Sequence, residues 1–287
     1  MPTFISCSRQ RPVLLLLAGF FLAASGCASL ASFAGRHEAA DRIARAAGFR
    51  KIFIETKDFV LTAYLRASEP GGDLTVYIEG DGAAWLTRRQ LSADPTPGKP
   101  LVLELAAMDP AANVAYLARP GQYTAGPFPV CDPIYWSARR FSKEVVKAMN
   151  EAVDRLRADA GSRRLNLIGY SGGAAIAVLI ASGRSDVVSL RTVAGNLDTE
   201  AVNRYHGVSP LEGSLNPIHR ARKLKYLPQH HFAGSADTVV PPFITESFAK
   251  QTGDEVRGKM TIIEGATHGE GWKARWRSLL AVPFQEP

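Results

Sequence analysis

The chain has 287 residues, 46% of them hydrophobic, and a formal net charge of +7 at neutral pH. It contains neither internal repeats nor a low-complexity tract, which excludes a repeat architecture. We recognise no nucleic-acid-binding module, so the positive charge alone does not predict a nucleic-acid partner.

The N-terminal residues have the pattern of a secretory signal. Arg9 and Arg11 precede an apolar run over residues 13–24, which is too short to span a bilayer comfortably. The run leads into an Ala-Ser-Gly-Cys segment ending at Cys27, which resembles a bacterial lipobox. In a lipobox the cysteine is lipidated and becomes the first mature residue. The alternative is an ordinary cleaved signal peptide with a chance cysteine.

The lipobox resemblance implies a signal peptide over residues 1–26 and an acyl anchor on Cys27. The next residue is Ala28 and not aspartate, which resembles the default routing to the bacterial outer membrane, facing the periplasm. Loss of residues 1–26 would leave 261 residues, enough for one domain with a full core. Only Cys131 would then remain as a thiol, which excludes an intramolecular disulfide. We expect Cys131 to be buried or partly buried.

Secondary-structure patterns follow in order along the rest of the chain. Residues 34–47 have an amphipathic pattern closed by Gly48, which predicts a small spacer helix within an anchor segment over 27–50. The main domain is then expected over 51–287. In it we expect two strands within 51–66, strands at 74–78 and 113–117, a helix over 141–156, alternating strands and helices, and a closing helix over 272–280. This alternation predicts an α/β fold with a mostly parallel sheet.

Residues 169–173 read Gly-Tyr-Ser-Gly-Gly and stand between an apolar run and a stretch of small aliphatic residues. This order predicts a strand, a sharp turn with Ser171 at its tip, and a helix. Gly169 and Gly173 would pass close to the neighbouring strand and helix, where a side chain would clash. The helix N-terminus beside Ser171 would direct free N–H groups toward a negative charge formed there. The alternative is a purely structural role, as a glycine-rich turn with a serine N-cap.

A serine hydroxyl needs a base, and the base needs an orienting acid. Asp237 follows a predicted strand that starts at Gln229, and His268 lies in a loop after another predicted strand at 261–263. The order Ser171, Asp237, His268 is the one found in α/β-hydrolases. Asp237 could instead cap the following helix, and His268 could be a surface histidine. Asp198 is the second candidate for the acid.

The loop Glu79-Gly80-Asp81-Gly82 follows a buried-strand pattern and can approach the serine turn. Its backbone would supply one donor of an oxyanion hole, from the N–H of Asp81 or that of Gly82. The other donor would be the N–H of Gly172. Such donors stabilise charge that develops on a substrate carbonyl oxygen. We expect the carboxylates of Glu79 and Asp81 to point away from this place.

These segments together resemble an α/β-hydrolase of the bacterial envelope, from about Phe53 to about Leu280. The matching parts are the serine turn, the Gly-Ser-Ala-Asp-x-Val-Val-Pro segment that contains Asp237 and the Gly-Ala-x-His-Gly segment that contains His268. Many members carry His-Gly where this chain has Glu79-Gly80. The resemblance implies the α/β-hydrolase fold, with helices on both faces of the sheet.

Other polar residues have simpler interpretations. His230 and His231 lie in a predicted strand and would point to opposite faces, which favours packing over metal binding. We expect no metal and no cofactor. Residues 219–225 carry a basic cluster that could contact anionic lipid or could form a solvated loop. Irregular stretches at 119–135 and 197–228 could shape the substrate site, the second as a small lid.

The leading hypothesis is therefore a serine hydrolase that acts on a small acyl ester or thioester through an acyl-enzyme. A second hypothesis is a catalytically silent hydrolase fold that serves as an envelope binding or scaffold lipoprotein. A third keeps the same triad but passes the acyl group to an alcohol or amine. The triad chemistry also allows amide cleavage, and the sequence leaves the oligomeric state open.

Overall fold

The computed structural model describes residues 35–87, 89–124, 131–253 and 260–284. The expected signal peptide and Cys27 lie outside the described residues. Among the described helices, none combines the length and the apolar character needed to cross a bilayer.

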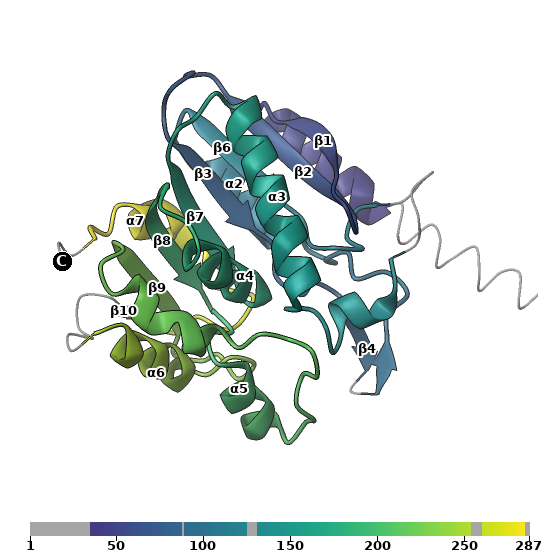
Figure 1. Cartoon of the computed structure of the whole chain (residues 1–287), viewed down its shortest axis with the longest axis vertical. Coiled ribbons are helices and arrows are strands. Elements are labelled where there is room, and N and C mark those ends of the chain that lie inside the picture. Colours follow the sequence, from purple (N-terminus) through teal and green to yellow (C-terminus); the bar gives the residue numbers. More distant parts are fainter. Residues whose placement is uncertain (1–34, 88, 125–130, 254–259, 285–287) are drawn as a thin grey trace, which may run out of the picture.

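The central feature is an eight-stranded sheet (Figure 1) with the strand order β1-β2-β6-β3-β7-β8-β9-β10. The first three strands in this order pair antiparallel, and every later pair is parallel. The sheet is therefore mostly parallel, as the alternation of strands and helices predicted. Its strands are β1 (Arg50–Glu55), β2 (Val60–Ala67), β3 (Leu74–Ile78), β6 (Asn113–Leu117), β7 (Leu165–Tyr170), β8 (Val187–Val193), β9 (Gln229–Gly234) and β10 (Met260–Ile263).

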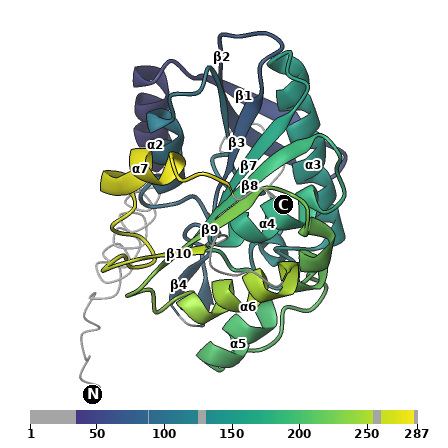
Figure 2. The same ribbon diagram turned by 90° about the vertical axis from the view of Figure 1, so that its left-hand side faces the viewer.

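Helices cover both faces of this sheet (Figure 2) and divide the core into two apolar clusters. One face carries α3 (Lys143–Asp159), α4 (Gly172–Ala181) and α6 (Pro242–Thr252). The other carries the helical residues 35–46, α2 (Leu101–Met108) and α7 (Trp276–Leu280). Central strands such as β3 and β6 are buried along their whole length, because helices cover both of their faces.

The helix over residues 35–46 belongs to the folded body. Ala40 and Ala44 are buried in one of the two apolar clusters. The Asp41 carboxylate accepts a hydrogen bond from the Tyr64 hydroxyl at 2.6 Å and pairs with Lys51. The expected spacer role is therefore wrong for this helix, because its apolar side packs on the sheet instead of standing between an anchor and the domain.

The main strands and helices lie where the sequence predicted them, and two elements were not expected. One is α2, and the other is a small exposed hairpin of β4 (Trp85–Thr87) and β5 (Gln90–Leu91). The expected closing helix is split into a 3-10 turn, η3 (Lys273–Arg275), and α7. The remaining elements are η1 (Pro133–Trp136), α5 (Thr199–His206) and η2 (Pro217–Leu224).

The stretch over 197–228, expected to hold a small lid, contains α5 and η2. Ala221 and Leu224 of η2 are buried in the core beside α4 and α6. This half of the stretch is therefore a structural element of the domain, and α5 is the part that lies further out.

A glycine-dependent contact joins β3 to α4, and it gives a stability prediction. A Cβ on Gly173 would lie 2.2 Å from the carbonyl oxygen of Ile78 and 2.5 Å from that of Glu79. Since backbone must move to relieve this clash, we expect Gly173→Ala to lower the free energy of unfolding by about 2 kcal/mol or more. Urea unfolding measures this, with Gly98→Ala as a matched control because nothing lies within 4 Å of a Cβ at Gly98. Equal stability of the two variants would contradict the close contact.

Candidate active site

Ser171 lies at the junction between β7 and α4, with a φ of 51° and a ψ of −120°. A non-glycine residue in this region of backbone space is strained, and such strain is characteristic of functional turns. Gly169 makes the turn possible, because a Cβ there would lie 2.4 Å from the Cα of Ala174. The turn places the Ser171 hydroxyl at the carboxyl edge of the sheet, at the N-terminus of α4.

The structure brings Ser171, His268 and Asp237 together in one chain of hydrogen bonds. Ser171 Oγ lies 3.0 Å from His268 Nε2, and His268 Nδ1 lies 2.9 Å from Asp237 Oδ2. The three residues come from the ends of β7, β9 and β10, which are neighbours or near neighbours in the parallel part of the sheet. Parallel strands end at the same edge, so loops distant in sequence converge there.

The Asp237 carboxylate is fixed by the backbone of its own turn. Its Oδ1 accepts hydrogen bonds from the N–H groups of Val239 and Val240, both at 2.8 Å, and the side chain is fully buried. Its other oxygen remains for His268. The N-cap of α6 is Pro241, so Asp237 is not the cap of that helix.

Two aromatic residues that the sequence analysis did not single out hold the His268 loop. The Tyr170 hydroxyl donates to the His268 carbonyl oxygen at 2.9 Å, and the Trp272 indole N–H donates to the same oxygen at 3.0 Å. The Tyr170 ring also lies beside the imidazole, with 5.3 Å between ring centroids. In the sequence, only the place of Tyr170 directly before Ser171 could have pointed to this role. No general rule requires a tyrosine at that place, so the sequence alone did not predict it.

The loop after β3 lies directly against the serine turn, as expected for an oxyanion hole. A Cβ on Gly80 would lie 3.3 Å from the Ser171 Cβ. The N–H of Gly172 is in the first turn of α4, where backbone donors have no partner within the helix. Within the part of the chain that the structure describes, the N–H groups of Asp81 and Gly82 have no hydrogen-bond acceptor either. Three backbone donors are thus available near Ser171.

The two carboxylates of this loop differ in position. Glu79 turns toward the core, where its oxygens accept from the Gly80 N–H at 2.8 Å and the Tyr116 hydroxyl at 2.9 Å. Asp81 does not point away: a Cβ on Gly172 would meet its Oδ1 at 2.0 Å. The expectation for Asp81 is therefore wrong, and the absence of a side chain at Gly172 leaves room for this carboxylate.

Two arginines from distant loops explain the position of the Asp81 carboxylate. Arg119 Nη1 lies 3.4 Å from Asp81 Oδ1, and Arg140 Nε lies 3.2 Å from Oδ2. Both guanidinium groups lie near the Phe141 ring, and Arg119 also donates to the carbonyl oxygen of Arg140. Burial lowers the pKa of Arg119 to about 10, so it stays charged at neutral pH. The pair offsets a negative charge that would otherwise oppose an oxyanion beside Gly172.

The remaining candidates have structural roles. Asp198 caps α5 by accepting from the Ala201 N–H at 3.1 Å, so it is not the acid that faces His268. His230 contacts Thr261 and His231 contacts Thr192, as packing residues would. Among the described residues, no group of three or more histidine, cysteine or carboxylate residues is arranged to hold a metal ion.

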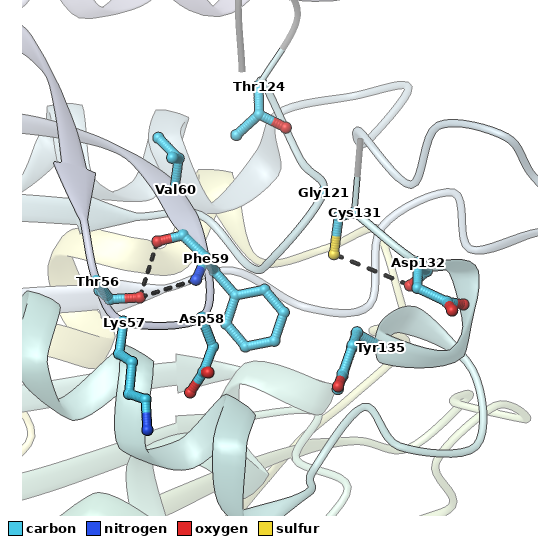
Figure 3. A pocket seen from close by; sticks show the side chains of 10 residues that line it. All are labelled: Thr56, Lys57, Asp58, Phe59, Val60, Gly121, Thr124, Cys131, Asp132 and Tyr135. Carbon is cyan, nitrogen blue, oxygen red and sulfur yellow. Dashed lines mark hydrogen bonds between the residues drawn. The ribbon is translucent and has the colours of Figure 1, made fainter. Parts of the chain in front are cut away.

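A cavity of about 250 Å³ lies beside the turn between β1 and β2, apart from the triad residues (Figure 3). Phe59 and Tyr135 form an edge-to-face pair in its wall. Cys131 also lines it, and burial raises the pKa of this thiol to about 12, so it is protonated at neutral pH. Cys131 is therefore partly buried, as expected, and it lacks the thiolate that a nucleophile requires.

The buried Glu79 gives a pH prediction. Burial raises the pKa of its carboxyl from 4.5 to about 7, although its two hydrogen-bond donors oppose the shift. The pKa of Glu79 is higher in the folded protein than in the unfolded chain. The neutral carboxyl therefore stabilises the folded protein at pH values below the unfolded pKa, and this stabilisation is lost as the pH rises through about 7. Relative to Glu79→Gln, the unfolding free energy of the natural protein should fall by up to about 3 kcal/mol over that range. Urea unfolding of both proteins across this range measures the difference, and parallel pH profiles would contradict it.

The similarity of this chain to known proteins is seen in its structure. No protein-family model matches the chain, and no curated protein sequence matches it. Among solved structures, it is similar to Est1E from Butyrivibrio proteoclasticus, with a TM-score of 0.58 and 13% identity over 80% of this chain and 97% of that one. It is similar to the Pyrococcus furiosus esterase Pf2001, with a TM-score of 0.56 and 14% identity over 81% and 90% of the two chains. A membrane phospholipase A described as a bacterial virulence factor gives a TM-score of 0.53 and 18% identity over 95% and 98%. With its sheet order and its helices on both faces, the chain has the α/β-hydrolase fold.

Proposed function

We propose that this protein is a serine hydrolase that cleaves a carboxylic ester or thioester through an acyl-enzyme. The observation that carries the proposal is the continuous chain of hydrogen bonds from Asp237 through His268 to Ser171, at a strained turn before a helix. The names of two of the similar structures, an esterase and a phospholipase, support an ester as the substrate.

In this mechanism Ser171 Oγ attacks the acyl carbon while His268 Nε2 takes its proton. Asp237 keeps His268 in the orientation that directs Nε2 at the serine, and it stabilises the imidazolium that forms. The bond to the leaving oxygen or sulfur then breaks, and His268 gives the proton to the leaving group. Water, deprotonated by His268, then attacks the acyl carbon, the bond from this carbon to Ser171 Oγ breaks, and His268 returns the proton to Ser171 as the acid leaves.

The tetrahedral intermediate needs donors for its oxyanion. The N–H of Gly172 is one, and the N–H of Asp81, or that of Gly82, is the second. Since Arg119 and Arg140 hold the Asp81 side chain from two directions, they position the backbone of this loop. Each such donor contributes about 3 kcal/mol to lowering the barrier.

The proposal predicts the behaviour of Ser171→Ala. The natural protein should hydrolyse p-nitrophenyl butyrate and react with a fluorophosphonate probe, and the variant should lose the labelling and at least about 10⁴-fold of the turnover, because no other hydroxyl lies in contact with His268 Nε2 in the described site. Ser182→Ala, at the other end of α4, is the matched control and should keep both properties. Absence of labelling and turnover in the natural protein would end the hydrolase proposal.

The same assay separates the alternatives. A silent scaffold would be inert toward both reagents, but the 3.0 Å contact between Ser171 and His268 supports a competent site. An acyltransferase would be labelled and would transfer the acyl group to an added alcohol or amine, so analysis of the acyl products distinguishes it from a hydrolase.

We also propose that residues 1–26 are removed, that Cys27 carries the lipid anchor, and that the protein faces the periplasm from the outer membrane. The lipobox resemblance supports this assignment. Metabolic labelling with an alkyne fatty acid in a bacterial host should mark the natural protein and not Cys27→Ala. Cys131→Ala is the control and should be labelled like the natural protein, whereas labelling of Cys27→Ala would contradict the anchor.

A further inference from the structure

Large exposed apolar side chains gather around the candidate site. Nine such residues occur in the described part of the chain. Six of them follow the carboxyl ends of β3, β8 and β9, the edge of the sheet at which Ser171 and Asp237 lie. Each is between 44% and 56% exposed, and we call them the apolar rim: Trp85, Leu86, Tyr205, Val208, Val239 and Phe243.

One part of the rim continues from the candidate oxyanion loop. Trp85 and Leu86 lie on β4, three residues beyond Gly82, and all residues of that strand are exposed. The base of the hairpin is fixed, since the Ala83 N–H donates to the Pro95 carbonyl oxygen at 2.9 Å. The two side chains are therefore presented to solvent by an anchored element.

The other part of the rim adjoins Asp237, the proposed acid of the triad. Val239 is one of the two residues whose N–H groups donate to Asp237, and its carbonyl oxygen lies 2.8 Å from Nε2 of His206 at the end of α5. Tyr205 and Phe243 are in edge contact, with 5.9 Å between ring centroids. In both ribbon views α5 and the β4 hairpin lie at the same end of the molecule (Figures 1 and 2).

The first described residues of the chain also lie at this end. Residue 35 begins the first helix, and the Arg36 guanidinium donates to the carbonyl oxygen of Thr96, in the loop that follows the hairpin. His37 packs against Tyr123, which follows the carboxyl end of β6. Arg36 lies nine positions after Cys27, a span of at most about 30 Å when extended. A lipid on Cys27 would hold this edge of the sheet near a bilayer.

We propose that the apolar rim docks on a lipid surface and that the esters reaching Ser171 come from that surface. The identity of the substrates as esters rests on the proposed function, whereas the docking itself does not. A membrane is the occupant we favour because the rim adjoins the site at the loop after β3 and at Asp237, and because the first described residues, nine positions after the proposed anchor, lie at the same edge. Exposed apolar side chains that lie together, as Tyr205 and Phe243 do, mark interaction surfaces.

The tryptophans provide a direct test of docking. Of the four in the chain, Trp136, Trp272 and Trp276 are buried and Trp85 is 46% exposed. The full chain bound to vesicles of phosphatidylcholine and phosphatidylglycerol should therefore show blue-shifted emission and reduced quenching by acrylamide. Trp85→Phe should show neither change, and Ser171→Ala should show both. Vesicle-bound protein with unchanged emission and quenching would overturn the docking proposal.

An activity measurement provides a second test of the docking proposal. Leu86→Ser and Phe243→Ser together should lower turnover of a long-chain ester carried in the same vesicles by about tenfold or more. Turnover of water-soluble p-nitrophenyl acetate should be unchanged, because neither residue contacts the triad. Tyr226→Ser, which removes a 74% exposed ring away from the rim, is the matched control and should match the natural protein on both esters.

The outcomes distinguish this proposal from the hydrolase proposal. Failure of the natural protein on both esters, with the fluorescence change intact, would refute hydrolysis and leave docking in place. Equal activity of the double variant and the natural protein on vesicle esters would refute the rim as the route for substrate. A blue shift that depends on protein concentration and needs no vesicles would assign the rim to a second copy of the chain.

Discussion

The close contact between the loop after β3 and the turn at Ser171 is the constraint on which the site depends. Gly173 lies against the carbonyl oxygens of Ile78 and Glu79, so no side chain fits between the two segments. The contact fixes the Ser171 hydroxyl and the backbone donors of the loop relative to one another before any substrate binds. Preorganised donors of this kind need no rearrangement when charge develops, which is why they lower a barrier effectively.

Charge placement follows from the same contact. A carboxylate beside Gly172 would repel an oxyanion. The guanidinium groups of Arg119 and Arg140, which pair with the Asp81 carboxylate, offset this repulsion. Glu79 is handled differently: burial raises the pKa of its carboxyl to about 7, and the Gly80 N–H and the Tyr116 hydroxyl donate to its two oxygens. The negative charge of Asp81, whose carboxylate lies beside Gly172, is therefore offset by two cations.

The sequence predicted the parts of the fold that depend on regular burial. Strands such as β3 and β6 are short continuous apolar runs. In α3 the apolar residues recur with the helical period. The β4 hairpin was missed because its exposed, short strands have no alternation to detect. The pairing of Arg119 and Arg140 with Asp81 was also missed, since the two arginines come from irregular loops and only tertiary structure brings them together.

The two donors on the carbonyl oxygen of His268 have a consequence for motion in the proposed catalytic cycle. A base of this type must meet two partners in succession, first the attacking oxygen and then the departing one. Because Tyr170 and Trp272 pin the peptide group of His268, the exchange is left to small rotations of the imidazole about its own side-chain bonds. Such rotations take picoseconds to nanoseconds, whereas loop displacement takes nanoseconds to microseconds. In the proposed mechanism, the aromatic pair thus leaves proton delivery to rotation of the His268 side chain and not to movement of its loop.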